Sequence, residues 1–413
     1  MSYPFLQTAE EVEELAHKLS RESEIAVDTE ADSFFHYFEK ICLVQIAAKS
    51  GIYLIDPLAM GEDGLRPLAK IFADPGICKV FHAAEYDLYV LQRHSGIQIS
   101  NLFDTMVSAQ LLGYPSVGLA SLVERHFDVK LSKDQQRTDW SRRPLRSAQI
   151  EYAGADVKYL IESKRRLEKE LKARKRLHWA EEEFLALEKR VWPKRTFDKD
   201  GYLKIKGAKQ LSPRGLAILR ELYLMRDRRA RAVDRPPFRL LGNGTLIDLA
   251  QNPPRSRHAY TTRKGVTDLV MRRMGQDIMD AVESGVEGPE LAAVEPKRAR
   301  GGRKRLDRRG EGRLEQLKEW RAKRARELEL DPGVFCPNAT LEQIACANCA
   351  NVEELRELSL LKDWWIDSFG VEVLRIATAD CAEQVRKPSP GEPLRKRPRG
   401  RRRRSAKGAQ AKG

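Results

Sequence analysis

The sequence predicts an α/β domain with a mixed sheet, followed by two all-α helical modules. Between residues 1 and 190, short apolar runs typical of strands, such as EIAVDTE and ICLVQIA, alternate with segments of helical period. After Trp192 the strand-like runs fade and helical patterns dominate. A shift of 95 residues then superposes Met225–Ala250 on Trp320–Ala345 without a gap, which indicates a duplicated module.

The order of these segments defines the expected domains. Three strand candidates, EIAVDTE, ICLVQIA and GIYLIDP, precede the first clear helix, so we expect an antiparallel meander that leads into β/α alternation. A basic linker separates the helical copies, and the Pro-, Gly- and Arg-rich end of the chain is expected to be disordered. The expected boundaries are an α/β domain at 1–190, a first helical domain at 208–290, the linker at 291–310, a second helical domain at 311–383 and the basic tail at 384–413.

The composition excludes several classes of protein. The chain of 413 residues is 41% hydrophobic and 33% charged, and no apolar run is long enough to span a membrane. Its acidic, amphipathic start differs from a signal peptide. Six cysteines without the spacing of a disulfide framework fit a reducing environment. We therefore expect a cytoplasmic protein with no membrane partner.

The formal net charge of +15 is concentrated in two short segments. Residues 297–309 carry a net charge of +7 and residues 386–413 a net charge of +11, which leaves −3 for the rest of the chain. Arginine runs such as RKRPRGRRRR attract phosphates and release counterions on binding. These segments therefore favour contact with RNA or DNA, and solubilising charge is the alternative.

Two carboxylates follow the first of the apolar runs. Asp28 and Glu30 are separated by one residue on a predicted strand, so their side chains leave the same face. Neighbouring anions at the end of a core strand repel each other and lose hydration unless cations lie between them. A metal site is one interpretation of the pair and a solvated strand end is the other, so further carboxylates are needed to decide.

Two later segments supply the missing acidic residues. FHAAEYDLYVL places Asp87 near the start of a helix, and EYAGADVKYL places Tyr152 and Asp156 four residues apart on one helix face. Each residue alone has an ordinary explanation, such as a charge that favours a helix start or a half-buried core aromatic. Their combination with Asp28 and Glu30, in this order, favours a metal site.

The three acidic segments resemble the exonuclease motifs of the DEDD superfamily, and the tyrosine four residues before the last aspartate marks its DEDDy branch. The surrounding text, including CLVQIA, LIDPL, FHAAEYDL, TDW and EYAGADVKYL, resembles ribonuclease D across residues 20–165. The duplicated module resembles the nucleic-acid-binding HRDC domain. This resemblance implies a ribonuclease H-like, DnaQ-like fold and a 3′–5′ exoribonuclease that releases 5′-mononucleotides, with a role in the 3′ maturation of tRNA and other small structured RNAs.

The resemblance also implies a role for each site residue. Two divalent ions, Mg²⁺ or Mn²⁺, would be bound by the carboxylates, which are the hard ligands that these metals accept. Asp28, Glu30 and Asp156 would bind the metal that holds the attacking water. Asp28 would bridge to the second metal, and Asp87 would contribute there through water. Tyr152 would orient and help to activate the attacking water, because a phenol with a pKa of about 10 is a poor base unaided.

Three more residues are candidates for contact with RNA. Gln45 in CLVQIA could touch the substrate or line the sheet, and the pattern favours neither. Trp140 in TDW could stack on a base, and Arg143 could hold a phosphate. The alternative, which we favour for these two, is that Trp140 anchors its loop and Pro144 starts a helix.

Other polar residues are expected to be structural. Asp104 in LFDTM is expected to cap the helix that follows. Arg146 stands where the resembled family usually has a Thr or Ser cap, so Ser147 is the expected cap of the tyrosine helix. The CANC segment has no second CxxC or nearby pair of histidines, so we expect no zinc site.

The candidate site residues are compatible with several other functions. The carboxylates do not distinguish RNA from DNA, so a DNA 3′–5′ exonuclease is one alternative. A non-catalytic RNA-binding adaptor is another, although no carboxylate of the set is missing. A third is that the arginine-rich tail directs the protein to ribosomes or the nucleoid. We expect a monomer that binds the 3′ ends of tRNA precursors and small RNAs.

Overall fold

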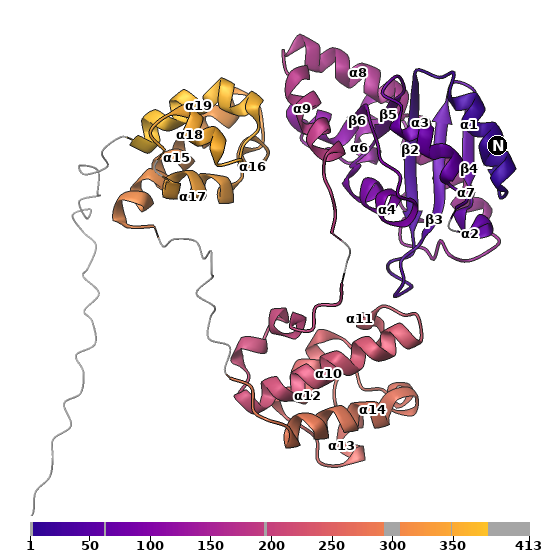
Figure 1. Ribbon diagram of the computed structural model, residues 1–413, viewed down its shortest axis with the longest axis vertical. Coiled ribbons are helices and arrows are strands. Elements are labelled where there is room, and N and C mark those ends of the chain that lie inside the picture. The colour runs from indigo at the N-terminus through magenta and orange to yellow at the C-terminus, as the bar shows by residue number, and fades with distance from the viewer. Residues whose placement is uncertain (1–2, 62, 194–195, 293–305, 348, 379–413) are drawn as a thin grey trace, which may run out of the picture.

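The computed structural model describes residues 3–61, 63–193, 196–292, 306–347 and 349–378. Figure 1 shows an α/β unit followed by two helical units. The predicted tail at 384–413 and most of the predicted linker at 291–310 lie outside the described residues.

A mixed sheet forms the centre of the α/β unit, with the strand order β1-β4-β3-β2-β5-β6. Its middle strands form the predicted antiparallel meander, while β5 runs parallel to β2, β6 parallel to β5, and β1 parallel to β4. The strands are β1 (Phe5–Leu6), β2 (Glu24–Ala31), β3 (Ile41–Ala48), β4 (Gly51–Ile55), β5 (Cys78–Phe81) and β6 (Leu102–Asp104).

Helices cover both faces of this sheet. Strand alternation places Val27, Val44 and Ile46 on the face that belongs to the main core, and Leu43 and Leu54 on the opposite face. The helices of this unit are α1 (Ala9–Leu19), α2 (Pro57–Met60), α3 (Ala69–Ala73), α4 (Glu85–Ser95), α5 (Thr105–Leu111), α6 (Leu119–Phe127), α7 (Ser147–Lys158), α8 (Leu160–Ala173) and α9 (Leu177–Glu188).

Helix α1 precedes the meander, which differs from the expected order of three strands before the first helix. A capping box starts it, in which Glu11 N donates to Thr8 Oγ1 (3.2 Å) and Thr8 N donates to the Glu11 carboxylate (3.0 Å). Its apolar stripe, which includes Val12 and Leu15, is buried in the main core.

The start of α7 corrects two predictions. The helix begins at Ser147, so neither Ser147 as its cap nor Pro144 as its first residue is right. Arg146 occupies the cap position, and its backbone N–H donates to the side-chain oxygen of Gln149 (3.1 Å). The side chain of Gln149, in the first turn, therefore accepts the backbone N–H group of the cap residue. The Asp104 prediction is confirmed, because its carboxylate accepts the N–H groups of the first turn of α5.

The two helical units repeat the same pattern at the predicted spacing of 95 residues. Arg226 donates to the carbonyl of Leu241, and Arg321 donates to the carbonyl of Cys336, both at 2.8 Å. The helices are α10 (Pro213–Ala232), α11 (Pro237–Leu240), α12 (Asn243–Gln251), α13 (Arg257–Thr261) and α14 (Asp268–Glu287) in the first, and α15 (Arg308–Glu327), α16 (Pro332–Phe335), α17 (Asn338–Ala347), α18 (Val352–Glu357) and α19 (Asp363–Thr378) in the second.

The second helical unit shares a continuous hydrophobic core with the α/β unit. Trp179 of α9 stacks on Trp364 of α19, with ring centroids 4.4 Å apart. The Glu182 carboxylate accepts the backbone N–H groups of Asp363 (2.6 Å) and Trp364 (2.7 Å) at the start of α19. The first helical unit instead has a core of its own.

The described helices include none that is long and apolar enough to cross a membrane.

Replacing Trp364 by Ala should destabilise the α/β unit together with the second helical unit. Trp364 is 6% exposed, and removal of a buried tryptophan costs about 3–5 kcal/mol of unfolding free energy. Urea unfolding followed by far-UV circular dichroism measures this loss. Val371→Ala, at a position 55% exposed on the same helix, is the control and should change stability by less than about 0.5 kcal/mol. A loss of that small size for Trp364→Ala would contradict the shared core.

Candidate active site

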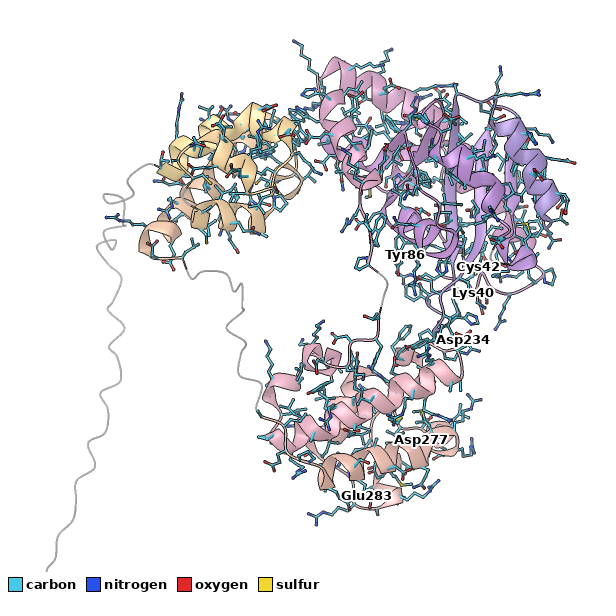
Figure 2. The ribbon with its side chains drawn as sticks, viewed as in Figure 1. Lys40, Cys42, Tyr86, Asp234, Asp277 and Glu283 are labelled. Atoms are coloured by element: carbon cyan, nitrogen blue, oxygen red, sulfur yellow. The ribbon has the colours of Figure 1, made fainter. Side chains whose placement is uncertain are left out.

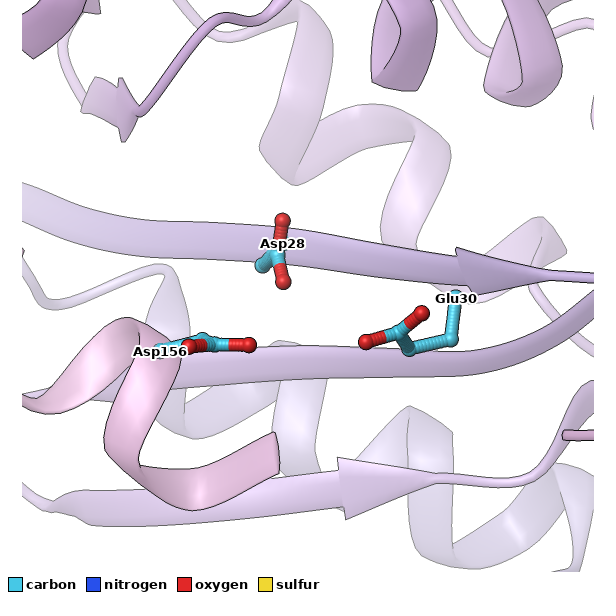
Figure 3. Close-up of side chains that lie close together, drawn as sticks. All are labelled: Asp28, Glu30 and Asp156. Carbon is cyan, nitrogen blue, oxygen red and sulfur yellow. The ribbon is translucent and has the colours of Figure 1, made fainter. Parts of the chain in front are cut away.

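Three of the predicted carboxylates meet at one end of the sheet (Figure 3). Strand β2 presents Asp28 and Glu30 on one face, and α7 crosses this face and brings Asp156 beside them. One carboxylate oxygen from each residue lies within 4.8 Å of the others. This spacing allows one cation to contact all three.

Tyr152 lies one helical turn before Asp156 and faces the same pocket. The pocket has a volume of about 330 Å³ and is open to the outside. The carboxylates therefore face a space that is accessible from solvent. Its walls are formed by Asp28, Thr29, Glu30, His82, Ala83, Gly118, Leu119, Ala120, Leu131, Ser132, Lys133, Gln136, Tyr152, Asp156 and Leu160.

Asp87 is placed by the first turn of α4, and it is not one of the three carboxylates within 4.8 Å. Its carboxylate accepts a hydrogen bond of 2.5 Å from the Thr29 hydroxyl, on the residue between Asp28 and Glu30. The contact ties α4 to the strand that carries the other two carboxylates. The side chain of Asp87 is buried, with 6% exposed.

Asp104 contributes to this arrangement in a way that the sequence did not reveal. Besides capping α5, its carboxylate accepts the backbone N–H groups of Ala83 (3.1 Å) and Ala84 (2.8 Å). Ala83 has a left-handed backbone, with φ of 61°, and the turn leads directly into α4. Asp104 therefore holds the turn that positions Asp87. The cap was visible as an Asp before a helix, but the second contact joins segments about 20 residues apart.

The clustered carboxylates, of which Asp28 and Glu30 are half-buried and Asp156 is buried, resist ionisation in the absence of a cation. Burial raises the pKa of Asp28 to about 7, and burial together with the neighbouring Asp28 raises the pKa of Asp156 to about 8. Burial and the charges of Asp28, Asp156 and Asp87 raise the pKa of Glu30 well above its usual range. Each added negative charge thus makes the next ionisation less favourable.

The donor set fits a divalent metal. Its atoms are carboxylate oxygens, which are hard ligands, and a cation among them would remove the mutual repulsion. The residues able to hold the metal are Asp28, Glu30 and Asp156, with Asp87 close by through Thr29.

Two contacts support the tyrosine helix. The ring of Trp140 lies against Tyr152, with centroids 6.0 Å apart. On the other side, a Cβ at Gly154 would lie only 2.1 Å from the ring of Tyr3. The glycine therefore allows Tyr3 to pack against α7 between the positions of Tyr152 and Asp156.

The structure places Trp140 and Arg143 within the protein framework. Trp140 is 1% exposed, so its indole has no open face for a base. The Arg143 guanidinium donates two hydrogen bonds of 2.6 Å to Asp56 and one of 2.7 Å to the carbonyl of Cys42. These contacts support anchoring of the loop before α7 over stacking or phosphate binding.

Gln45 lies directly opposite Asp28 in the β2–β3 pair and is fully buried. Partners directly across an antiparallel pair share a face, so its side chain projects to the side that carries Asp28. No residue that the structure describes forms a hydrogen bond with either amide atom of Gln45. Gln45 thus lies beside the carboxylate cluster but is not among the residues that line the pocket.

Comparisons with known proteins agree with this geometry. Residues 3–172 match the 3′–5′ exonuclease family, and residues 215–282 and 310–377 each match the HRDC domain. Ribonuclease D of Zymomonas mobilis is 31% identical over 93% of this chain and 96% of its own. The crystal structure of Escherichia coli RNase D, described as an exoribonuclease involved in structured RNA processing, covers 91% of this chain and 98% of its own at 26% identity, with a TM-score of 0.63.

A second solved structure is similar over a shorter span. The catalytic core of RRP6 from Trypanosoma brucei covers 69% of this chain and 80% of its own at 30% identity, with a TM-score of 0.63. The match of both domain types, in the order seen here and over nearly the full length of a curated relative, completes the assignment. The chain belongs to the ribonuclease D family of 3′–5′ exoribonucleases.

Proposed function

We propose that this exoribonuclease trims the 3′ ends of tRNA precursors and other small structured RNAs and releases 5′-mononucleotides. The observation that carries the proposal is the group of three carboxylates within 4.8 Å of one another, with Tyr152 beside them in an open pocket. The involvement of the Escherichia coli relative in structured RNA processing supports the class of substrate.

The proposed cofactors are two divalent ions, Mg²⁺ or Mn²⁺. When bound, such ions acidify a water and neutralise the charge that gathers on the phosphate during hydrolysis. Asp28, Glu30 and Asp156 would hold one ion, and Asp28 and Asp87 would contribute to holding the second. Thr29 keeps Asp87 in place through its hydrogen bond of 2.5 Å.

Tyr152 acts on the attacking water as a protonated phenol. Burial, followed by the charge of Asp156, raises the pKa of Tyr152 far above its usual value. Without bound cations the hydroxyl therefore keeps its proton, and in the proposed reaction it orients the attacking water through hydrogen bonds. The indole of Trp140 packs against the ring of Tyr152 and limits its movement.

The proposed domains and basic segments together cover most of the chain. We place the exonuclease domain at 1–190 and the HRDC domains at 208–290 and 311–383, with basic segments at 291–310 and 384–413 that add affinity for RNA. The protein acts as a cytoplasmic monomer. The basic segments supply most of the electrostatic attraction for RNA, because the rest of the chain, with the HRDC domains included, has a slight negative charge.

Asp28→Asn should abolish metal-dependent shortening of RNA. Loss of several kcal/mol of charge stabilisation lowers the rate at least about a hundredfold. The assay is a time course with a 5′-labelled single-stranded RNA and a DNA of the same sequence, with Mg²⁺, Mn²⁺ or EDTA. Asp134→Asn, on an exposed residue, is the control. A metal-dependent ladder on RNA supports the proposal, whereas shortening of DNA alone, or binding without shortening, would contradict it.

Tyr152→Phe should lower kcat while leaving KM for RNA nearly unchanged. The substitution removes the hydroxyl and keeps the ring that packs on Trp140, so the expected loss is about a hundredfold. Steady-state kinetics on a short oligoribonucleotide separate the two constants. A rise in KM with an unchanged kcat would show that the hydroxyl binds substrate and does not act on the water.

The stability of the metal-free enzyme should fall as the pH rises from about 4 to about 8. Asp28 and Asp156 have raised pKa values in the folded state, so within this window the unfolded chain binds fewer protons than the folded one. Urea unfolding in EDTA at pH 5 and pH 7.5 measures the slope. Asp156→Asn should reduce it, and Mg²⁺ should stabilise the wild type more at pH 7.5 than at pH 5. A flat profile in EDTA would contradict buried, unpaired carboxylates.

A further inference from the structure

A groove of about 640 Å³ lies between the exonuclease domain and the first HRDC domain. One wall is the loop 33–39, which follows β2, together with Arg93 of α4. The other wall is formed by α10 and the residues around Phe238, and Phe197 of the connecting segment closes one side. Nothing in the proposed chemistry uses this groove.

The groove walls are fixed to each other by polar contacts. Asp234, which has a left-handed backbone with φ of 46°, accepts the backbone N–H groups of Tyr37 and Phe38, both at 3.0 Å. The same carboxylate lies 2.9 Å from His36 Nδ1. Tyr37 donates its hydroxyl hydrogen to Asp227 (2.9 Å). Figure 2 shows Asp234 at the end of the first HRDC domain that faces the exonuclease domain.

Aromatic rings in the groove remain accessible despite these contacts. Phe38 is 47% exposed, Phe238 is 56% exposed and Phe197 is 39% exposed. Exposed phenylalanines gathered from three separate segments are costly to keep in water unless they have a partner. Flat rings that line a groove are the platforms on which the bases of single strands stack.

Three arginines and three carboxylates line the groove, so its formal charges balance. Glu39 is paired with Arg93, and the carboxylate of Asp227 accepts the Tyr37 hydroxyl. Arg231 is exposed, and its guanidinium lies 5.7 Å from the ring centre of Phe38. Such a pairing of arginine and aromatic ring suits a phosphate next to a stacked base.

The groove begins close to the metal ligands. Ser33 lies three residues after Glu30, a span of at most ~10 Å along extended chain. Tyr86, the neighbour of Asp87, donates to Glu39 and lies 3.4 Å from the Ser33 hydroxyl. The loop that forms one wall is therefore tied to both segments that carry carboxylates.

We propose that this groove binds the single-stranded segment of RNA just upstream of the 3′ end that is being hydrolysed. Bases stack on Phe38 and Phe238, and Arg231 contacts the backbone. The inference rests on the proposed exoribonuclease function and adds where the incoming strand is held. Because stacking does not read sequence, the groove accepts RNA ends of varied sequence.

The test measures binding and hydrolysis separately in the full-length protein. Fluorescence anisotropy in EDTA gives the affinity for a 5′-labelled single-stranded 12-mer, and a dinucleotide assay with Mg²⁺ reports the metal site alone. Phe38→Leu and Phe238→Leu keep apolar volume but remove the stacking surface. Each should weaken 12-mer binding about tenfold and leave kcat/KM for the dinucleotide unchanged.

Matched variants separate stacking from a general structural effect. Phe38→Trp keeps a flat ring and should bind the 12-mer as the wild type does. Leu269→Ala, at a position 47% exposed on α14 and outside the groove, should change nothing. Arg231→Ala should reduce the slope of log affinity against log salt by about 0.7, as expected for one lost phosphate contact on a single strand.

Failure of this proposal and failure of the exoribonuclease proposal have different signatures. If the wild type cleaves neither substrate, the exoribonuclease proposal is wrong. If the wild type cleaves both the 12-mer and the dinucleotide, and Phe38→Leu binds the 12-mer normally, the groove does not hold RNA. Its exposed aromatic rings are then expected to bind another protein. Equal losses on the 12-mer and the dinucleotide would also overturn the groove, because they would show damage to the metal site.

Discussion

Three carboxylates held within 4.8 Å of one another, with Asp87 tied to their strand through Thr29, are the constraint on which the rest of this structure depends. Burial and mutual repulsion oppose the ionisation of each, so the fold must hold them together against an unfavourable electrostatic energy. It does so by attaching them to rigid elements. Asp28 and Glu30 lie on a central strand paired on both sides, while Asp156 lies on a helix packed across that strand. A divalent cation among the carboxylates would offset their repulsion, so the arrangement that is unfavourable without the ion would bind it.

Two sets of polar contacts account for buried polar residues that lie outside the carboxylate cluster. Arg143 and Asp56 form a two-point ion pair that fixes the loop leading into α7, and Asp104 fixes the turn leading into α4. A charge-assisted, two-point contact restrains orientation as well as distance. Both contacts lie just before a helix that carries a site residue. Small shifts in helix position would separate the carboxylate oxygens, so these contacts help to preserve the geometry of the candidate metal site.

The sequence predicted what depends on local periodicity. The face shared by Asp28 and Glu30 follows from strand alternation, and the turn between Tyr152 and Asp156 follows from helical spacing. The duplication was visible because matching residues recur at a fixed spacing of 95, and the structure shows that Arg226 and Arg321 among them make equivalent contacts. Contacts between distant segments were not predictable in this way. The Arg143–Asp56 pair spans 87 residues, and the Thr29–Asp87 hydrogen bond spans 58, with no pattern that links the partners.

The duplicated HRDC domains have acquired different relations to the exonuclease domain. The second domain joins its hydrophobic core through the stacked Trp179 and Trp364, so it is part of the same cooperative unit. The first domain keeps its own core and contacts the exonuclease domain through polar groups around Asp234. The apolar burial that joins the second domain is strong and non-directional. The hydrogen bonds that join the first domain to a loop backbone cost less free energy to break. Because that loop continues directly from β2, displacement of the first HRDC domain acts on the strand that carries Asp28 and Glu30. The first HRDC domain is thus the one joined by hydrogen bonds to the loop that follows the strand of Asp28 and Glu30.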